Sequence, residues 1–380
     1  MDKILREPTK AVRSYGLDLM RAIAISLVLL AHFAQKIEFL GFWGVELFFA
    51  LSGFLIGNIL WRSFSQTESW SFAYLFNFWK RRWWRTLPNY YLFLIVSLVF
   101  SYLVYASIPE VNEFVHYLYF GQNLFTPNGT FFGVSWSLCI EEWFYLTFPL
   151  VLFSLSCLKL QKKICYALTL LIYILAAICL RYYFVGVYDE GAIRGITFAR
   201  LDAIAYGVLV SFVTVQIPMS KNVILIAFTL GLALIASPGI IAMLNDISYH
   251  EMKYNPIYLT AVPLGASFMI PFMNTLKKPK RLFRFMAKPI YNFSLWSYSI
   301  YLSHIPLLYL GYYIFREYRL SFIGNLTSKI FGLALTIVCS ALVFRFFETP
   351  FTKMRPKELK HTSEEILINE EDKIEKIPPL

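Results

Sequence analysis

Apolar runs long enough to cross a bilayer recur along nearly the whole chain, and they constrain its fold more than any other feature. Each run holds about 18 to 23 residues, enough for a helix to cross roughly 30 Å of hydrocarbon. Backbone polar groups in hydrocarbon must be bonded within the segment, which favours helices over open strands. Of the 380 residues, 58% are hydrophobic and 16% are charged, unlike a soluble domain of this size. The sequence therefore predicts an all-α, polytopic membrane helix bundle.

We predict about ten transmembrane helices. They are placed at residues 17–35, 42–60, 88–106, 136–156, 164–184, 200–217, 222–240, 256–274, 294–314 and 322–346. The first run does not have the pattern of a cleaved signal peptide, because Asp18 and Arg21 lie inside it and no small-residue cleavage site follows.

The distribution of positive charge predicts the orientation. Most of the 35 Lys and Arg residues fall in the N-terminal segment, in alternate loops and in the C-terminal tail, whereas the opposite loop at residues 107–135 has none. The positive-inside rule then places both termini in the cytoplasm and predicts a multi-pass protein of the cell membrane.

Topology and contact with anionic membrane lipids account for the net charge of +11. No folded basic module for nucleic acid is visible, so nucleic acid is not an expected partner.

One membrane domain accounts for most of the chain. We assign residues 1–350 to it, and residues 351–380 to a polar, partly disordered cytoplasmic tail.

The five cysteines lie in or beside the predicted spans without a CxxC pair, which is typical of reduced, structural cysteines. No metal site is expected.

The first span carries three groups that are unusual in a membrane helix: Asp18, Arg21 and His32. Eleven residues of helix advance about 1,100°, so Arg21 and His32 share a face about 16 Å apart, with Asp18 near the same stripe. Charges inside a span are expensive and normally face a bundle interior or a water-filled cavity. The stripe is therefore a candidate functional site. The alternative is a buried pair of Asp18 with Arg21, with His32 merely near the outer interface.

A cluster of basic residues, FWKRRWWRTLPNYY, precedes the third span. In a continuing helix Arg81, Arg82 and Arg85 are spaced three and four apart, so several guanidinium groups could face one ligand. Such a cluster suits phosphates. The alternative is a plain positive-inside anchor with an interfacial tryptophan belt.

Two adjacent carboxylates, Glu141 and Glu142, lie in GVSWSLCIEEWFYLTFPL at the start of the fourth span. Adjacent residues of a helix point about 100° apart, so both are inward only if the bundle is wide or wet there. We expect one of them to face a catalytic cavity, with Tyr145 one turn beyond Glu141 and able to hydrogen-bond it. A structural ion pair with Arg21 or Arg200 is the alternative.

Three further polar residues lie within predicted spans. They are Arg200 and Asp202 in FARLDAIAYG, and His304 in SYSIYLSHIPLL. A lone histidine in a span is either functional or a hydrogen-bonded packing residue, and the sequence leaves both readings of His304 open.

Together these segments resemble acyltransferase family 3, a group of integral membrane O-acyltransferases that modify O-antigens, exopolysaccharides and nodulation factors. The resemblance rests on seven blocks in family order: GLDLMRAIAISLVLLAH, GVELFFALSGFLI, RRWWRTLP, SWSLCIEEWFYLTFP, RLDAIAYG, SYSIYLSHIP and FFETP. The second block supplies Glu46 and Ser52 as supporting residues. Where many members read GVDLFF this chain reads GVELFF, which keeps the carboxylate. Some members also carry an extra C-terminal domain, where this sequence has a short tail.

The resemblance implies transfer of an acyl group, most often acetyl, from cytoplasmic acyl-CoA to a hydroxyl of a cell-surface or lipid-linked glycan. Acetyl-CoA is the expected donor, held by Arg81, Arg82 and Arg85. His32 is the expected general base, Glu141 the group that holds its tautomer, and Arg21 a stabiliser of negative charge. An acyl-histidine intermediate is equally compatible with the sequence.

The alternative functions are succinyl transfer to periplasmic glucans and glycan transport without transferase activity. The oligomeric state is left open.

Overall fold

The computed structural model describes residues 13–34, 37, 39–67, 70–105, 107–126, 131–188, 190–245, 255–279 and 284–359. Within these ranges the predicted tail is covered only as far as residue 359, and residues 360–380 lie outside the described residues. The described part of the chain is all-α, as predicted.

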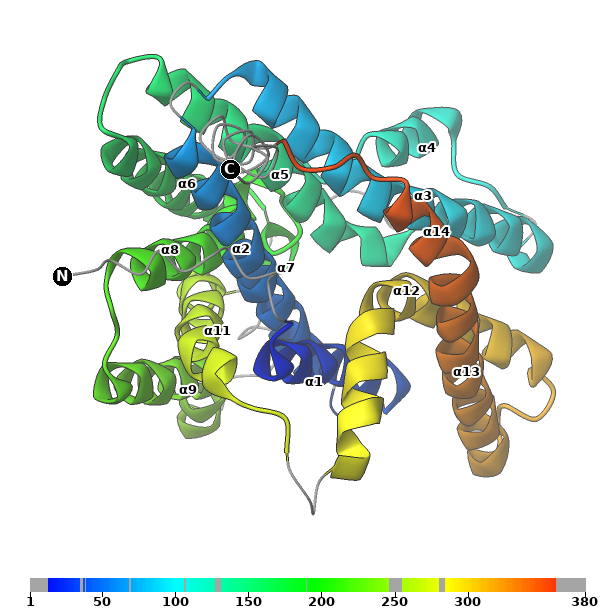
Figure 1. Cartoon of the computed structure of the whole chain (residues 1–380). Coiled ribbons are helices and arrows are strands. Elements are labelled where there is room, and N and C mark those ends of the chain that lie inside the picture. Colours follow the sequence, from blue (N-terminus) through cyan, green and yellow to red (C-terminus); the bar gives the residue numbers. More distant parts are fainter. Residues whose placement is uncertain are drawn as a thin grey trace, which may run out of the picture.

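Ten long helices occupy the ten predicted spans (Figure 1). They are α1 (Tyr15–Phe33), α2 (Leu40–Gln66), α3 (Phe72–Tyr105), α5 (Trp136–Ser156), α6 (Lys162–Val185), α8 (Asp202–Gln216), α9 (Lys221–Leu244), α11 (Tyr258–Thr275), α12 (Arg284–Ile314) and α13 (Phe322–Val343). The shorter elements are α4 (Val111–Leu118), η1 (Gly133–Ser135), α7 (Glu190–Ile193), η2 (Phe198–Arg200), a π-helical turn η3 (Phe344–Glu348) and α14 (Thr349–Lys353).

Among the described residues, eight helical segments are long and apolar enough to span a bilayer. The two remaining predicted spans, 256–274 and 294–314, form helices α11 and α12 but fall outside that set. Each contains two prolines, and α12 also carries a series of serine, tyrosine and histidine side chains. Both helices bury polar side chains completely: Ser267 of α11, and Ser299, Ser303 and His304 of α12.

The predicted boundaries are least accurate at the third span. The span was placed at residues 88–106, whereas α3 begins at Phe72 and continues without interruption through the basic cluster and Pro88. The whole RRWWR segment is thus helical, and its side chains project in directions set by the helical repeat.

Helix α2 lies at the centre of the bundle. It packs against α1, α8 and α11, while α1 also contacts α12, and α13 covers the far side of α12 (Figure 1). Small residues allow the closest approach: a Cβ at Gly53 of α2 would lie 2.0 Å from the carbonyl oxygen of Ile204 in α8. Helix contacts in membranes depend on such close packing, because lipid supplies no hydrophobic driving force between helices.

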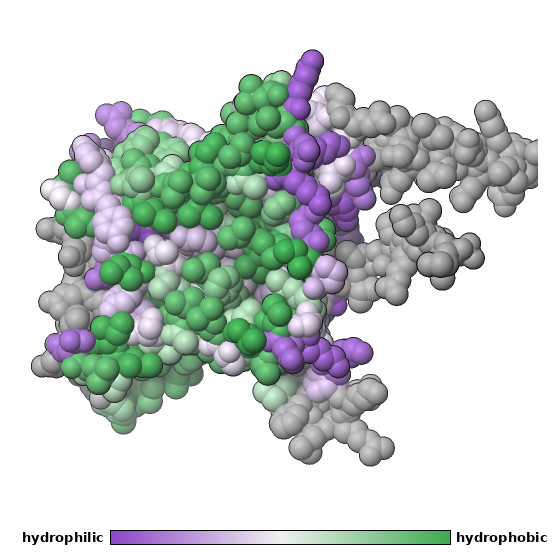
Figure 2. Space-filling model, turned by 90° about the vertical axis from the view of Figure 1, so that its left-hand side faces the viewer, coloured by the Kyte–Doolittle hydropathy of each residue, from purple (hydrophilic) through white to green (hydrophobic). Residues whose placement is uncertain are grey.

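The outer surface matches a bilayer environment. The face seen in Figure 2 is broadly hydrophobic, with hydrophilic side chains gathered mainly toward one margin. Large apolar side chains are exposed on the peripheral helices, among them Leu171 and Leu175 of α6 and Leu225, Ile226 and Leu230 of α9. Exposed apolar surface on this scale is typical of lipid contact.

The loop between α3 and α5 folds back onto the bundle. Tyr90 of α3 donates a hydrogen bond to the carbonyl oxygen of Tyr117 at 2.8 Å, and Trp143 of α5 donates one to that of Phe120 at 2.9 Å. Phe120 has a positive φ of 59°, a left-handed conformation that turns the chain sharply after α4. These bonds fix the loop against the two helices that line the cavities described next.

Candidate active site

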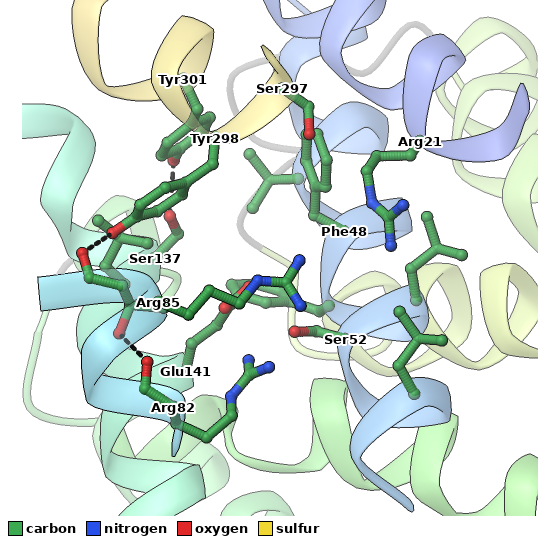
Figure 3. A pocket seen from close by; sticks show the side chains of 16 residues that line it. Arg21, Phe48, Ser52, Arg82, Arg85, Ser137, Glu141, Ser297, Tyr298 and Tyr301 are labelled. Carbon is green, nitrogen blue, oxygen red and sulfur yellow. Dashed lines mark hydrogen bonds between the residues drawn. The ribbon is translucent and has the colours of Figure 1, made fainter. Parts of the chain in front are cut away.

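A cavity of about 830 Å³ lies between α1, α2, α3, α5 and α12 (Figure 3). Five of the residues singled out in the sequence belong to its polar lining, and the other polar lining residues lie on the same helices or on α12. The lining polar residues are Arg21, Ser52, Arg82, Arg85, Thr86, Ser137, Glu141, Ser297, Tyr298 and Tyr301. Residues far apart in the sequence thus meet in one buried polar space within the membrane bundle.

Three guanidinium groups, those of Arg21, Arg82 and Arg85, line this cavity from two different helices (Figure 3). Arg21 has partners: it donates to the hydroxyl of Ser294 at 3.2 Å and lies 3.6 Å from Asp18. Arg82 and Arg85 form no ion pair or hydrogen bond through their side chains with any residue in the described part of the chain, and Nε of Arg82 is buried without a partner. Guanidinium groups that line a cavity without a neutralising partner are suited to binding a multiply charged anion.

Glu141 is the carboxylate in the lining of this cavity. Tyr145, one turn further along α5, donates a hydrogen bond to Glu141 at 2.8 Å and also contacts the hydroxyl of Ser52 on α2. The guanidinium group of Arg82 lies over the Tyr145 ring, 4.3 Å from its centroid. The polar chain Ser52, Tyr145 and Glu141 therefore joins α2 to α5 beside the arginines.

Glu142 faces a different space. It lines a second pocket of about 510 Å³, together with aromatic residues of α3, α5 and the folded-back loop. These include Trp83, Tyr91, Phe120 and Trp143. Adjacent residues of a helix point about 100° apart. Each of the two glutamates can therefore be internal, because each borders its own cavity.

Arg81 is directed away from the cavity. It donates to the carbonyl oxygen of Pro356 at 3.0 Å and lies 3.4 Å from the carboxylate of Glu358, which also pairs with Arg62 at 2.8 Å. The segment after α14 is thereby tied to the ends of α2 and α3. Of the three arginines predicted to hold a donor, the structure brings Arg82 and Arg85 together and separates Arg81 from them.

Two buried ion pairs account for three other predicted residues. Arg200 pairs with Glu46 at 2.5 Å, and both side chains have no exposed surface. Asp202 pairs with Arg181 of α6 and accepts a hydrogen bond from Tyr206 at 3.1 Å. The first pair joins α2 to η2 and the second joins α6 to α8, and none of the five residues lines the arginine cavity.

Asp18 lies beside the cavity rather than in its lining. It accepts hydrogen bonds from Arg13 at 2.7 Å and from Ser294 of α12 at 2.7 Å. Since Ser294 also binds Arg21, Asp18 fixes the position of that guanidinium group at the contact between α1 and α12.

His32 and His304 lie next to each other, on α1 and α12. Their ring centroids are 5.0 Å apart with an interplanar angle of 51°. His304 has no exposed surface, whereas His32, at the end of α1, is exposed. Tyr301, one turn before His304, has its ring centroid 5.8 Å from that of His304, and its hydroxyl meets Ser137 at 2.6 Å in the cavity lining. Tyr301 therefore connects the cavity lining to the histidine pair.

Sequence reasoning missed several residues of the site. Ser297, Tyr298 and Tyr301 line the cavity within the SYSIYLSH block, where only His304 was singled out. Ser297 and Tyr298 lie four and three residues before Tyr301, so each neighbours Tyr301 on the helix surface, a signal that could have found them. Arg181, the partner of Asp202, was also missed, although a charge near the end of a predicted span is itself a signal.

Comparison with known proteins agrees with this architecture. A family model described as an acyltransferase domain, that of acyltransferase family 3, matches residues 14–345. The chain is 27% identical to the peptidoglycan O-acetyltransferase OatA of Listeria monocytogenes, over 92% of this chain and 58% of that protein. It is 26% identical to the O-acetyltransferase OatA of Staphylococcus aureus, over 89% of this chain and 57% of that protein.

The chain thus spans less than two thirds of the length of these relatives. No solved structure matches it. The family match covers every helix that contributes to the cavity, from α1 to α12. This multi-pass membrane protein therefore belongs to acyltransferase family 3.

Proposed function

We propose that this chain is an O-acyltransferase that moves an acyl group, in the first instance acetyl, from acyl-CoA to a hydroxyl of a cell-surface glycan. The observation that carries the proposal is the cavity in which Arg82 and Arg85 have no ion-pair partner among the described residues. The phosphates of coenzyme A are the kind of multiply charged anion that such guanidinium groups bind. The printed names of the relatives support O-acetyl transfer as the reaction class.

The acyl donor would enter from the side of the bundle where α3 begins. Arg82 and Arg85 lie in the first half of α3, and the charge distribution predicts that the beginning of this helix faces the cytoplasm. The cavity extends from these arginines past Glu141 and Tyr298 to Tyr301 (Figure 3). The pantetheine arm would follow this path, which brings the thioester toward the histidine pair.

His32 is the proposed general base. It is exposed at the opposite end of α1 from Arg21, about 16 Å further along the helix, so a glycan at the outer face could reach it. The hydroxyl oxygen of the acceptor would attack the thioester carbonyl carbon while His32 takes the hydroxyl proton. A C–O bond forms, the C–S bond breaks, and the proton passes from His32 to the sulfur of the departing CoA thiol.

The acceptor is proposed as peptidoglycan or a chemically similar cell-surface glycan. The name of the Listeria relative supports this class of acceptor. The exposed ring of Phe125, in the loop between α3 and α5, offers an aromatic surface on which a sugar ring could stack.

The test is acyl transfer by the purified chain in proteoliposomes. Wild-type protein supplied with radiolabelled acetyl-CoA and extracted cell-surface glycan should release CoA thiol and label the glycan, whereas His32→Ala should do neither. Succinyl-CoA in competition tests the choice of acyl group. Glycan movement across the vesicle membrane without CoA release would overturn the proposal in favour of a transporter. Label trapped on His32 would replace direct transfer by an acyl-histidine intermediate.

A further inference from the structure

His304 is a buried histidine whose tautomer is set by the backbone. Its Nδ1 lies 2.7 Å from the carbonyl oxygen of Tyr301 and 3.2 Å from that of Ile300. Carbonyl oxygens only accept hydrogen bonds, so Nδ1 carries the proton and donates. In the neutral ring, Nε2 is then the nitrogen with the lone pair.

That lone pair has no partner within the described part of the chain. Nε2 of His304 is buried and makes no hydrogen bond to the protein. The side chain has no exposed surface, so bulk solvent does not supply a partner either. Buried polar atoms are almost always paired, and an exception calls for a functional explanation. The fold therefore holds a fixed, unsatisfied acceptor in the contact between α1 and α12.

The neighbouring ring is that of His32, with 5.0 Å between the two centroids. Ring nitrogens lie on the rim of the imidazole, so a rotation of the exposed His32 side chain would bring one of its N–H groups within reach of Nε2 of His304, directly or through one water. Glu141, the group expected from the sequence to hold His32, instead accepts a hydrogen bond from Tyr145.

We propose that His304 is the positioning residue for His32. Nε2 of His304 accepts a hydrogen bond from one ring nitrogen of His32, which keeps the other nitrogen unprotonated and directed toward the acceptor hydroxyl. This inference rests on the proposed function, in which His32 is the base. The arrangement assigns to a neutral imidazole the orienting role that a carboxylate fills in a catalytic triad.

Histidine ring ¹⁵N NMR of the full chain in lipid nanodiscs tests the proposal without any acyl donor. The sequence has five histidines, and the His32 signals are identified by their absence from the His32→Gln variant. The wild-type protein at a pH where His32 is neutral should show one dominant His32 tautomer. Comparable populations of both tautomers in the wild type would overturn the proposal, whether or not any His304 variant folds.

Two variants of His304 separate positioning from packing. His304→Leu removes the acceptor, and we expect mixed His32 tautomers and a kcat lowered roughly tenfold to hundredfold with an unchanged KM for acetyl-CoA. His304→Gln retains a side-chain carbonyl that can accept the same N–H, so it should restore one tautomer and most of kcat. Equal losses in both variants, with one His32 tautomer in each, would assign His304 to packing alone. A tautomer shift in His304→Leu together with no acyl transfer by the wild type would keep the positioning role and reject the proposed function.

Discussion

The guanidinium group of Arg82 lies over the ring of Tyr145, with 4.3 Å from its central carbon to the ring centroid. This contact joins α3 to α5 at the point where Tyr145 also binds Glu141. A cation held on the face of an aromatic ring keeps its N–H groups directed outward, available to an anion. Tyr145 thus holds one arginine of the cavity and is also the middle member of the polar chain from Ser52 to Glu141.

Arg85→Ala should raise the KM for acetyl-CoA by roughly tenfold to hundredfold, since a charge-assisted hydrogen bond is worth about 1.5–3 kcal/mol. Arg81→Ala is the matched control, because Arg81 lies in the same basic cluster but binds Pro356 and Glu358 instead of lining the cavity. Steady-state kinetics in proteoliposomes measure both. Equal effects of the two variants would show that the cluster acts only as a positive-inside anchor.

Glu141→Gln and Glu142→Gln should differ, although the residues are adjacent. Glu141 lines the arginine cavity and Glu142 the second pocket. Removing the Glu141 charge makes the donor site more positive, so the KM for acetyl-CoA should fall roughly threefold to tenfold by Coulombic attraction at an effective dielectric near 20. We expect kcat to fall as well, because the product CoA is held more tightly and the acceptor for Tyr145 is altered.

Glu142→Gln should change the KM for acetyl-CoA less than about threefold, since its carboxylate borders the other pocket. Stopped-flow measurement of CoA release separates chemistry from product release in both variants. A fall in KM for Glu142→Gln that matches that of Glu141→Gln would contradict the assignment of the two carboxylates to different cavities.

The sequence predicts the helices well and the pairing of their charges poorly. Apolar runs located all ten helices because hydrocarbon thickness sets a length that any span must meet. The rotation of each helix depends on packing, so nothing in RRWWR could reveal that Arg82 and Arg85 face the cavity while Arg81 faces Glu358. Likewise Arg200 was a candidate partner for a glutamate of α5, but it pairs with Glu46 across 154 positions of sequence. The convergence of Arg21 and Glu141 on one cavity is also a long-range result of packing.

Gly53→Ala should destabilise the bundle by about 1–3 kcal/mol, the cost of overpacking a close contact. The added Cβ would lie 2.0 Å from the carbonyl oxygen of Ile204, so α2 and α8 must separate. Gly239→Ala is the control, because a Cβ there meets no atom within 4 Å. Thermal unfolding in detergent, followed by size-exclusion chromatography, should show a lower midpoint for Gly53→Ala only. A midpoint unchanged in both variants would mean that the two helices are not packed as closely as described.

The pair of Arg200 and Glu46 should act on stability more than on chemistry. Both side chains are fully buried outside the arginine cavity, with 2.5 Å between Nη2 and Oε1. Glu46→Ala leaves an uncompensated buried guanidinium group and should cost about 3–5 kcal/mol, whereas Glu358→Ala, which breaks only partly exposed pairs, should cost about 1 kcal/mol or less.

The double variant Glu46→Leu with Arg200→Met distinguishes the two roles of this pair. Replacing both ions by apolar side chains removes the desolvation cost together with the attraction, so stability should return to near the wild-type value. Thermal unfolding in detergent measures this, and acyl transfer at saturating acetyl-CoA should then recover at least in part. If the double variant is as stable as the wild type yet entirely inactive, the pair takes part in the reaction, and the cavity at Arg82 and Arg85 is not the whole of the site.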